Sequence, residues 1–333
     1  MESLLDVKNL VTSFRTADGK LQAVRGVSFS VHKGETLCIV GESGCGKSIT
    51  TLSVMGLLPD NGEISEGVIT FNGEDLTKKK EEQMRKHRGN DISMIFQEPM
   101  TALNPVFTVG YQIMEPLHLH TKLGKRDKKK RAIELLNQVG LSNPEKVLKK
   151  YPHELSGGMR QRVMIAIALA CSPSLLIADE PTTALDVTIQ AQILDLIDDL
   201  KEDLGMGVMM VTHDMGVVAE VADRVMVMYA GEVVETGTVE EIFESPQHPY
   251  TKGLLASVPN VDDESHHLEA IPGTLPNLSE KISGCRFHPR CPYAMDKCKE
   301  NEPPHFQVSD QHQSKCWLHE EVDTNEYRNK AYS

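Results

Sequence analysis

A glycine-rich loop near the N-terminal end of the chain has the residue types needed to hold a chain of phosphates. The segment Gly41 to Ser48 reads GESGCGKS and matches the pattern GxxxxGK[ST] in full. Its glycines let consecutive backbone N–H groups turn inward around phosphate oxygens. Lys47 would reach the terminal phosphates, and the Ser48 hydroxyl would bind Mg²⁺. The helix expected to begin at Gly46 adds the positive end of its dipole. This phosphate loop predicts binding of a nucleoside triphosphate.

Two acidic residues follow an apolar segment much further along the chain. Residues 175–178 read LLIA, which is typical of a buried strand, and Asp179 and Glu180 come directly after it. Open α/β sheets bind their ligands at the carboxyl ends of such strands. We expect Asp179 to hold Mg²⁺, usually through water. We expect Glu180 to orient the water that attacks the γ-phosphate, because phosphoryl transfer depends mainly on positioning.

A second glycine motif lies shortly before the acidic pair. Residues 155–161, called the signature below, read LSGGMRQ. Ser156 and the amides of Gly157 and Gly158 are placed to open a helix. The signature therefore predicts a second helix end that binds an anion.

The order and spacing of these motifs resemble those of the ABC-type ATPases. The signature resembles the LSGGQ motif of that family, although Met159 stands where Gln is commonest. The resemblance covers roughly residues 4–258 and implies that the chain is an active ATPase that uses ATP and Mg²⁺. It also implies that the signature faces the γ-phosphate held by the opposite subunit of a dimer.

Further positions match motifs of that family. Gln97 in IFQEP matches a residue that contacts Mg²⁺ or water and communicates with the membrane partner, so Glu180, His213 and Gln97 form the implied catalytic set. His213 matches a histidine near the γ-phosphate, and Asp186 in ALD matches a residue at the dimer interface. Phe14 is the candidate for stacking on adenine.

The resemblance thus implies a full set of ligand contacts. The implied nucleotide contacts are Phe14, Gly41, Glu42, Ser43, Gly44, Cys45, Gly46, Lys47, Ser48, Ile49, Gln97, Ser156, Gly157, Gly158, Asp179 and Asp186. The implied ligands of Mg²⁺ are Ser48, Gln97 and Asp179.

Two segments resemble one branch of the family, the dipeptide and oligopeptide importer ATPases. They are residues 98–105, which read EPMTALNP, and residues 245–251, which read SPQHPYT. This resemblance implies a subunit that energises import of short peptides from the cytoplasmic face of the membrane. The implied partners are a second homologous ATPase in a heterodimer, two transmembrane permease subunits and an extracytoplasmic peptide-binding protein. Import of nickel or another small solute is the alternative within transport.

The C-terminal part of the chain contains Cys285, Cys291, Cys298 and Cys316. Disulfides are unexpected in a cytoplasmic protein. Structural zinc favours cysteines separated by two to four residues, and none of these pairs is that close. Four thiolates can instead hold an iron–sulfur cluster, and some peptide-importer ATPases have such a tail. A [4Fe–4S] cluster is therefore the expectation, with zinc or no metal as alternatives.

Composition limits the other possibilities. The formal net charge of −13 argues against nucleic acid as a partner. A soluble ABC ATPase that remodels nucleic acid or ribosomes is a rival, but such proteins usually carry two cassettes or long coiled-coil insertions. The N-terminus lacks the features of a signal peptide, and no segment approaches the roughly 18 apolar residues that span a bilayer. We therefore expect a cytoplasmic protein that binds the membrane peripherally.

The elements that must position these residues follow from the apolar pattern. Strands are expected at 4–10, 24–31 and 35–40, and a helix from 46 to about 56. A helical subdomain is expected at about 100–155, before helices and strands alternate between 158 and 228. Such alternation predicts a mainly parallel sheet covered on both faces. The expected fold is α/β, a P-loop NTPase of the ABC type with antiparallel N-terminal strands. We expect the ATPase domain at 1–258 and a loop-rich C-terminal module at 259–333.

Overall fold

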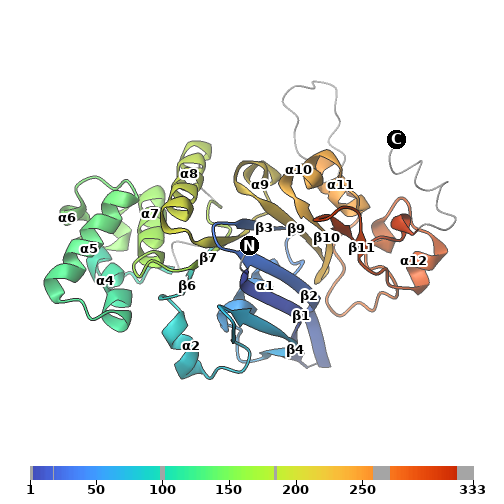
Figure 1. The fold of residues 1–333 in the computed structure, drawn as a ribbon, viewed down its shortest axis with the longest axis horizontal. Helices are drawn as coiled ribbons and strands as arrows, with labels where there is room; N and C mark the ends of the chain where they lie inside the picture. Colours follow the sequence, from blue (N-terminus) through green and yellow to red (C-terminus); the bar gives the residue numbers. More distant parts are fainter. Residues whose placement is uncertain (1–2, 18, 98–101, 184–185, 258–270, 321–333) are drawn as a thin grey trace.

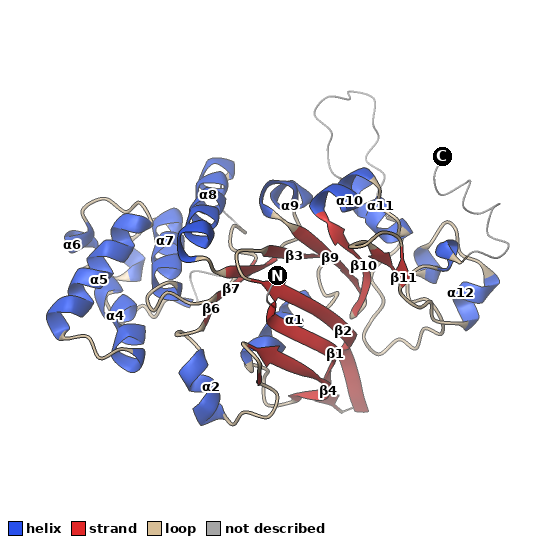
Figure 2. Ribbon diagram, viewed as in Figure 1, coloured by secondary structure: helices blue, strands red, loops and turns tan. Residues whose placement is uncertain are grey.

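Two β-sheets lie at the centre of the molecule, with helices at both ends (Figure 2). The computed structural model describes residues 3–17, 19–97, 102–183, 186–257 and 271–320. The strands are β1 (Ser3–Thr16), β2 (Gly19–His32), β3 (Thr36–Val40), β4 (Gly62–Phe71), β5 (Glu74–Asp75), β6 (Ile92–Ile95), β7 (Leu175–Asp179), β8 (Gly207–Val211), β9 (Arg224–Tyr229), β10 (Glu232–Thr238), β11 (Phe306–Gln307) and β12 (Gln313–Ser314). The α-helices are α1 (Lys47–Met55), α2 (Glu81–His87), α4 (Val109–His120), α5 (Lys125–Gln138), α6 (Pro144–Val147), α7 (Gly157–Ala168), α8 (Val187–Leu204), α9 (Met215–Val221), α10 (Val239–Glu244), α11 (Pro249–Ala256) and α12 (Asp296–Glu300).

The larger sheet carries the parallel strands. Its order is β11-β12-β10-β9-β3-β8-β7-β6, and the five strands from β9 to β6 run parallel. The smaller sheet is antiparallel, with the order β2-β1-β4-β5. This arrangement confirms the predicted fold class, a mainly parallel sheet combined with antiparallel N-terminal strands.

The central strands are buried on both faces, which explains their continuous apolar sequences. In β3, Leu37 and Ile39 pack into the core beneath the antiparallel sheet. Cys38 and Val40 point the other way, into the core shared with the helices. Successive side chains of a strand alternate in this manner. The parallel strands are therefore enclosed by the core on both sides.

The antiparallel sheet is more extensive than the sequence predicted. Strands were expected at 4–10 and 24–31, but β1 and β2 are both longer. Strand β4 was not predicted, because its sequence GEISEGVITF alternates poorly and contains Gly67. A Cβ at Gly67 would lie 2.5 Å from the carbonyl oxygen of Asn9, so the two backbones approach closely at this glycine.

Helices α4, α5, α6 and α7 form one end of the molecule, and α12 lies at the opposite end (Figure 1). Three of these helices, α4, α5 and α7, contact one another through buried side chains such as Ile113, Leu136 and Val163. The segment expected to be helical at about 100–155 is therefore helical over most of its described residues.

The C-terminal region, residues 271–320, extends the larger sheet. Strand β12 pairs with β10, with Glu235 opposite Ser314, and β11 pairs with β12. A separate, loop-rich module was expected here, because periodic apolar segments are absent after about residue 259. Instead, two short polar strands of this region add to the sheet beside β10. The predicted boundary between 258 and 259 lies outside the described residues and stays a prediction.

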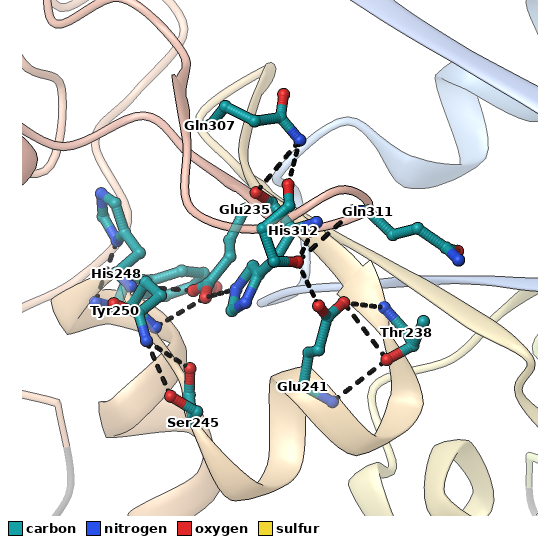
Figure 3. A network of polar contacts seen from close by, with 11 residues as sticks. Glu235, Thr238, Glu241, Ser245, His248, Tyr250, Gln307, Gln311 and His312 are labelled. Atoms are coloured by element: carbon teal, nitrogen blue, oxygen red, sulfur yellow. Dashed lines mark hydrogen bonds and ion pairs between the residues drawn. The ribbon is translucent and has the colours of Figure 1, made fainter.

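A buried carboxylate joins the C-terminal region to the sheet (Figure 3). Glu235 is fully buried and accepts hydrogen bonds from the backbone N–H groups of Gln247 at 2.6 Å and His248 at 2.9 Å. Its third partner is the Nε2 atom of His312, at 2.7 Å. Each of these bonds satisfies a polar group that would be costly to bury alone. The C-terminal region is thus held by specific contacts.

Candidate nucleotide site

The phosphate loop connects β3 to α1 and depends on its glycines. Gly41, Gly44 and Gly46 have φ values of 147°, 85° and 112°, a region that other residues rarely adopt. A Cβ at Gly41 would lie 2.2 Å from the carbonyl oxygen of Met228. Only glycine fits there, so the loop's tight path across the end of β9 explains this part of the motif.

Lys47 and Ser48 lie in the first turn of α1. The Lys47 ammonium donates to the carbonyl oxygens of Gly41 at 2.7 Å and Glu42 at 3.2 Å, and the residue is only 4% exposed. The Ser48 hydroxyl donates to Asp179 Oδ1 at 3.1 Å. The structure therefore brings the loop and the first acidic residue together, although they are far apart in sequence.

The hydroxyl of Ser48 and the carboxylate of Asp179 fit a Mg²⁺ site, because this ion prefers oxygen ligands. Burial raises the pKa of Asp179, and the neighbouring Glu180 raises it further, although the hydrogen bond from Ser48 opposes the shift. A buried, partly desolvated carboxylate of this kind is stabilised when a cation binds beside it.

Glu180 is the centre of a second cluster. Its Oε2 accepts hydrogen bonds from Gln97 Nε2 at 2.8 Å and Thr183 Oγ1 at 2.9 Å, and its Oε1 lies 3.2 Å from His213 Nδ1. Glu180 follows β7, whereas Gln97 follows β6 and His213 follows β8. The three predicted catalytic residues therefore meet at the carboxyl ends of adjacent parallel strands, as open α/β sheets arrange their sites.

The backbone and charge of Glu180 are both unusual. Its φ of 48° is positive, which costs free energy for a residue other than glycine and is often found at functional sites. Burial raises the pKa of Glu180, but hydrogen bonds from Thr183 and His213 outweigh it and leave the pKa below the ordinary value. The carboxylate is thus held ionised and oriented. Thr183 was missed by the sequence reasoning, although it lies only three residues beyond Glu180.

The signature opens helix α7. Ser156 is its N-cap and accepts a hydrogen bond from Met159 N at 3.4 Å, and both Ser156 and Gly157 are exposed. Gly158 lies against Ile189, since a Cβ there would be 3.1 Å from its side chain. An open helix end of this kind is available to an external anion.

Two further predicted residues lie on other elements. Asp186 is the N-cap of α8 and accepts from Ile189 N at 3.0 Å. Phe14 lies in β1 opposite Gly62, with its ring close to that glycine. Neither residue hydrogen bonds to the phosphate loop among the contacts of the described residues, so their nucleotide contacts stay predictions.

Three more of the predicted nucleotide contacts have distinct surroundings. The Cys45 side chain is buried, and burial raises the pKa of its thiol. Ile49 lies in α1, where it packs against the core beneath the antiparallel sheet. Ser43 is exposed. These side chains point to packing roles for Cys45 and Ile49, while their backbone amides remain the candidate phosphate ligands.

The prediction of a metal in the C-terminal region is not supported. All four cysteines there are free thiols. Burial raises the pKa of Cys285 to about 11 and that of Cys291 to about 12, and the thiols of Cys298 and Cys316 shift in the same direction. Within the described residues, no group of three or more His, Cys, Asp or Glu side chains is placed to hold a metal ion.

Two family models match the sequence. The ABC transporter model matches residues 24–183, and the model of the oligopeptide/dipeptide transporter C-terminal region matches residues 234–298. No helix within the described residues is long and apolar enough to span a membrane.

Similar proteins include an oligopeptide transport ATP-binding protein, AppD, of Bacillus subtilis strain 168. It is 54% identical over 322 residues, which cover 96% of this chain and 98% of the relative. The dipeptide transport ATP-binding protein DppD of the same organism is 53% identical over 322 residues, covering 96% of both chains.

Solved structures show the same fold. A dimeric ATP-binding cassette, MJ0796, bound to ADP and phosphate, has a TM-score of 0.64 and 29% identity and covers 71% of this chain and 98% of its own. The structure of cbiO1 of Clostridium perfringens has a TM-score of 0.63 and 28% identity, covering 74% of this chain and 92% of its own.

Proposed function

This chain belongs to the ABC transporter family of ATP-binding proteins, and from that premise we propose that it hydrolyses ATP to energise import of dipeptides and oligopeptides. The observation that carries the proposal is the meeting of Gln97, Glu180 and His213 beside the Ser48–Asp179 pair. The match of the C-terminal region to that of oligopeptide/dipeptide transporters and the names of the similar proteins support the peptide branch.

The proposed chemistry assigns a role to each cluster. The phosphate loop and Lys47 would bind the phosphates, and Ser48, Asp179 and Gln97 would hold a Mg²⁺ ion. The bound ion would supply positive charge beside the transferring phosphoryl group. Glu180, held ionised, accepts a hydrogen bond from the attacking water and aligns it. His213 and Gln97 keep the Glu180 carboxylate oriented, and His213 lies where it can also reach the γ-phosphate.

The proposed active unit contains two ATPase subunits. The signature of this chain would complete the site of a second, homologous ATPase, and the second signature would complete the site described above. Exposure of Ser156 and Gly157 supports this arrangement, as does the 83% exposure of the apolar residue Val187 next to Asp186. We propose a heterodimer.

Exposed apolar residues support a permease partner. Phe107 and Tyr111 stack with ring centroids 4.5 Å apart and are 41% and 48% exposed, and Leu119 on α4 is 74% exposed. Phe96, which adjoins Gln97, is 43% exposed. Such residues suit a protein interface better than water. We propose that this end docks on two permease subunits at the cytoplasmic face of the membrane and that a peptide-binding protein delivers the substrate.

The substitution Glu180→Gln tests the catalytic assignment. Glu180→Gln should bind ATP with nearly unchanged affinity but lose turnover, because the amide cannot hold the attacking water as a carboxylate does. Glu220→Gln, an exposed change on α9, is the matched control and should hydrolyse ATP normally. Near-normal hydrolysis by Glu180→Gln would refute the role of Glu180.

The four cysteines carry a separate proposal, a [4Fe–4S] cluster in the C-terminal region. Its support is the chemistry of the four cysteines, all of which are free thiols in the same region of the chain. Protein purified without oxygen should absorb near about 400 nm and contain iron. Zinc in metal analysis would favour the alternative, and protein without either metal would refute both.

A further inference from the structure

One arginine of the C-terminal region reaches the phosphate loop. Arg290 donates through Nη1 to Glu42 Oε2 at 2.6 Å and through Nη2 to Glu42 Oε1 at 2.9 Å. This is a bidentate pair, which fixes both distance and orientation. The Nε atom of Arg290 donates to the carbonyl oxygen of Pro272 at 2.7 Å, so the whole guanidinium is engaged.

The arginine is held on its other side by an aromatic cluster. Arg290 is 8% exposed, and its guanidinium carbon lies 5.7 Å from the centre of the Tyr229 ring. The Tyr229 ring packs edge-on against Tyr250 at 4.7 Å and against Phe287 at 5.1 Å. Tyr229 ends β9 and Phe287 belongs to the C-terminal region. The position of Arg290 is therefore determined jointly by the ATPase core and the C-terminal region.

Glu42 is held through its backbone as well. Its N–H group donates to the hydroxyl of Tyr250 at 2.8 Å, and Tyr250 is fully buried. The carbonyl oxygen of Glu42 accepts from Lys47, the residue assigned to the phosphates. The side chain of Leu275 lies beside the same loop, 3.6 Å from the point where a Cβ at Gly44 would stand. Arg290 thus holds the side chain of Glu42, and Tyr250 holds its main chain.

We propose that Arg290 and Tyr250 are positioning residues for ATP binding, which act by clamping Glu42 and so setting the shape of the phosphate loop. The C-terminal region is then part of the ATP site. The charges of the pair also support this role. The Glu42 carboxylate belongs to a loop that must bind a polyphosphate. Without Arg290, the negative charge of this carboxylate would oppose phosphate binding. This inference rests on the proposed ATPase function.

Variants of the pair provide the test, with the full chain and a fluorescent ATP analogue. Arg290→Gln should weaken ATP binding about tenfold, since it leaves an uncompensated carboxylate near the phosphates. The kcat at saturating ATP should stay within about threefold of wild type, because the cluster around Glu180 is untouched. The double variant Glu42→Gln/Arg290→Gln should recover most of the affinity. Arg290→Lys should be intermediate, because it keeps the charge and loses the bidentate geometry.

A matched control breaks another buried contact between the same two parts. Lys315 in the C-terminal region pairs with Glu232 at 2.7 Å, so Lys315→Met should lower thermal stability and leave ATP affinity unchanged. Tyr250→Phe removes only the hydroxyl that accepts from Glu42 and should weaken ATP binding about threefold. If Arg290→Gln does not fold, the ATP affinity of Tyr250→Phe tests the proposal instead.

The outcomes separate this inference from the function on which it rests. Wild-type affinity in folded Arg290→Gln, or in Tyr250→Phe, would overturn the inference while leaving Glu180-dependent hydrolysis intact. An equal loss of affinity in Lys315→Met would also overturn it, because a general loosening of the C-terminal region would then explain the effect. Absence of ATP hydrolysis by the wild-type transporter would instead overturn the proposed function.

Discussion

Glu180 combines a strained backbone with an unusually well-satisfied side chain. Its φ is positive, and its carboxylate has three hydrogen-bond partners, Gln97, Thr183 and His213. Strain of this kind persists only where the surroundings determine the conformation. The strained backbone lowers stability, but it holds the carboxylate in a defined orientation before the nucleotide and the water bind.

Thr183 should control the acid side of the pH profile. Its hydrogen bond helps to lower the pKa of Glu180 against the effect of burial, so Thr183→Val should raise that pKa. The ATPase activity of the variant should then begin to fall at a higher pH than that of wild type as the solution is acidified. Profiles of kcat against pH measure the shift. Thr183→Ser keeps a hydroxyl and is the control; identical profiles for Thr183→Val and wild type would contradict the assignment.

The same shift has a consequence for stability. Because the pKa of Glu180 is lower in the folded protein, the ionised carboxylate stabilises the fold above the pKa of the unfolded chain. That contribution disappears as the pH falls through the lower, folded-state pKa. In Thr183→Val this contribution is smaller, and thermal unfolding should show a reduced gain in stability as the pH rises from acidic values.

Single residues were predictable where a motif is local. The loop 41–48 and the acidic pair were found because each motif is continuous in sequence. Thr183 and Arg290 were missed, because their importance depends on Glu180 and Glu42. The partner of Arg290 lies 248 positions away, and no short pattern records such a contact.

Among the helices, α7 begins at a capping residue that also belongs to the proposed interface with a second ATPase. Ser156 caps the helix, so Ser156→Ala should cost about 1 kcal/mol of stability. Ser156→Asp keeps a capping oxygen but adds a negative charge at the exposed helix end. This variant should be more stable than Ser156→Ala. Its affinity for the second ATPase in the presence of ATP should nevertheless fall at least about tenfold, because the added carboxylate repels the phosphates. Light scattering with ATP checks association.

The comparison of these two variants separates the cap from the interface. If Ser156→Asp associates as well as wild type, the signature does not face a bound nucleotide. If Ser156→Ala and Ser156→Asp lose stability equally, Ser156 does not act as the cap.

Strands were predictable where burial on both faces gives an apolar run. Strands β3 and β7 are such cases, and their predicted positions are confirmed. Strand β10 reads EVVETGT and carries two buried glutamates, Glu232 and Glu235, which a sequence pattern assigns to the surface. These acids are buried because Lys315 and His312 of the C-terminal region pair with them.

Docking of the C-terminal region should therefore depend on His312. His312→Ala removes one of three partners of the buried Glu235 carboxylate and should cost about 1–3 kcal/mol of unfolding free energy, measured with urea. Gln311→Ala is the matched control, since its side chain is exposed and points away from Glu235 (Figure 3). Equal stability of the two variants would show that the pair does not anchor this region.

In the whole molecule, three functional parts follow one another along the long axis. The helical end carries exposed apolar residues, the ATP site lies at the central sheets, and the C-terminal region forms the opposite end (Figure 1). We propose that Gln97 communicates the state of the γ-phosphate to the helical end. The contact of Arg290 with the phosphate loop connects the same site to the other end.

The general fold was predictable because alternating helices and strands allow few topologies. The extra strands at the edge of the sheet were not, because β11 and β12 are each two residues long and polar. Their pairing depends on contacts with β10 that only the folded chain contains.

The central claim is that ATP hydrolysis by this chain drives peptide import. The most direct measurement is the ATPase rate of the complex co-purified with its permease and second ATPase, in lipid vesicles, with and without the binding protein and peptide. We expect peptide and binding protein to raise the rate several-fold and Glu180→Gln in this chain to lose most of the stimulated activity. A rate that does not respond to peptide, or that survives Glu180→Gln, would contradict the claim.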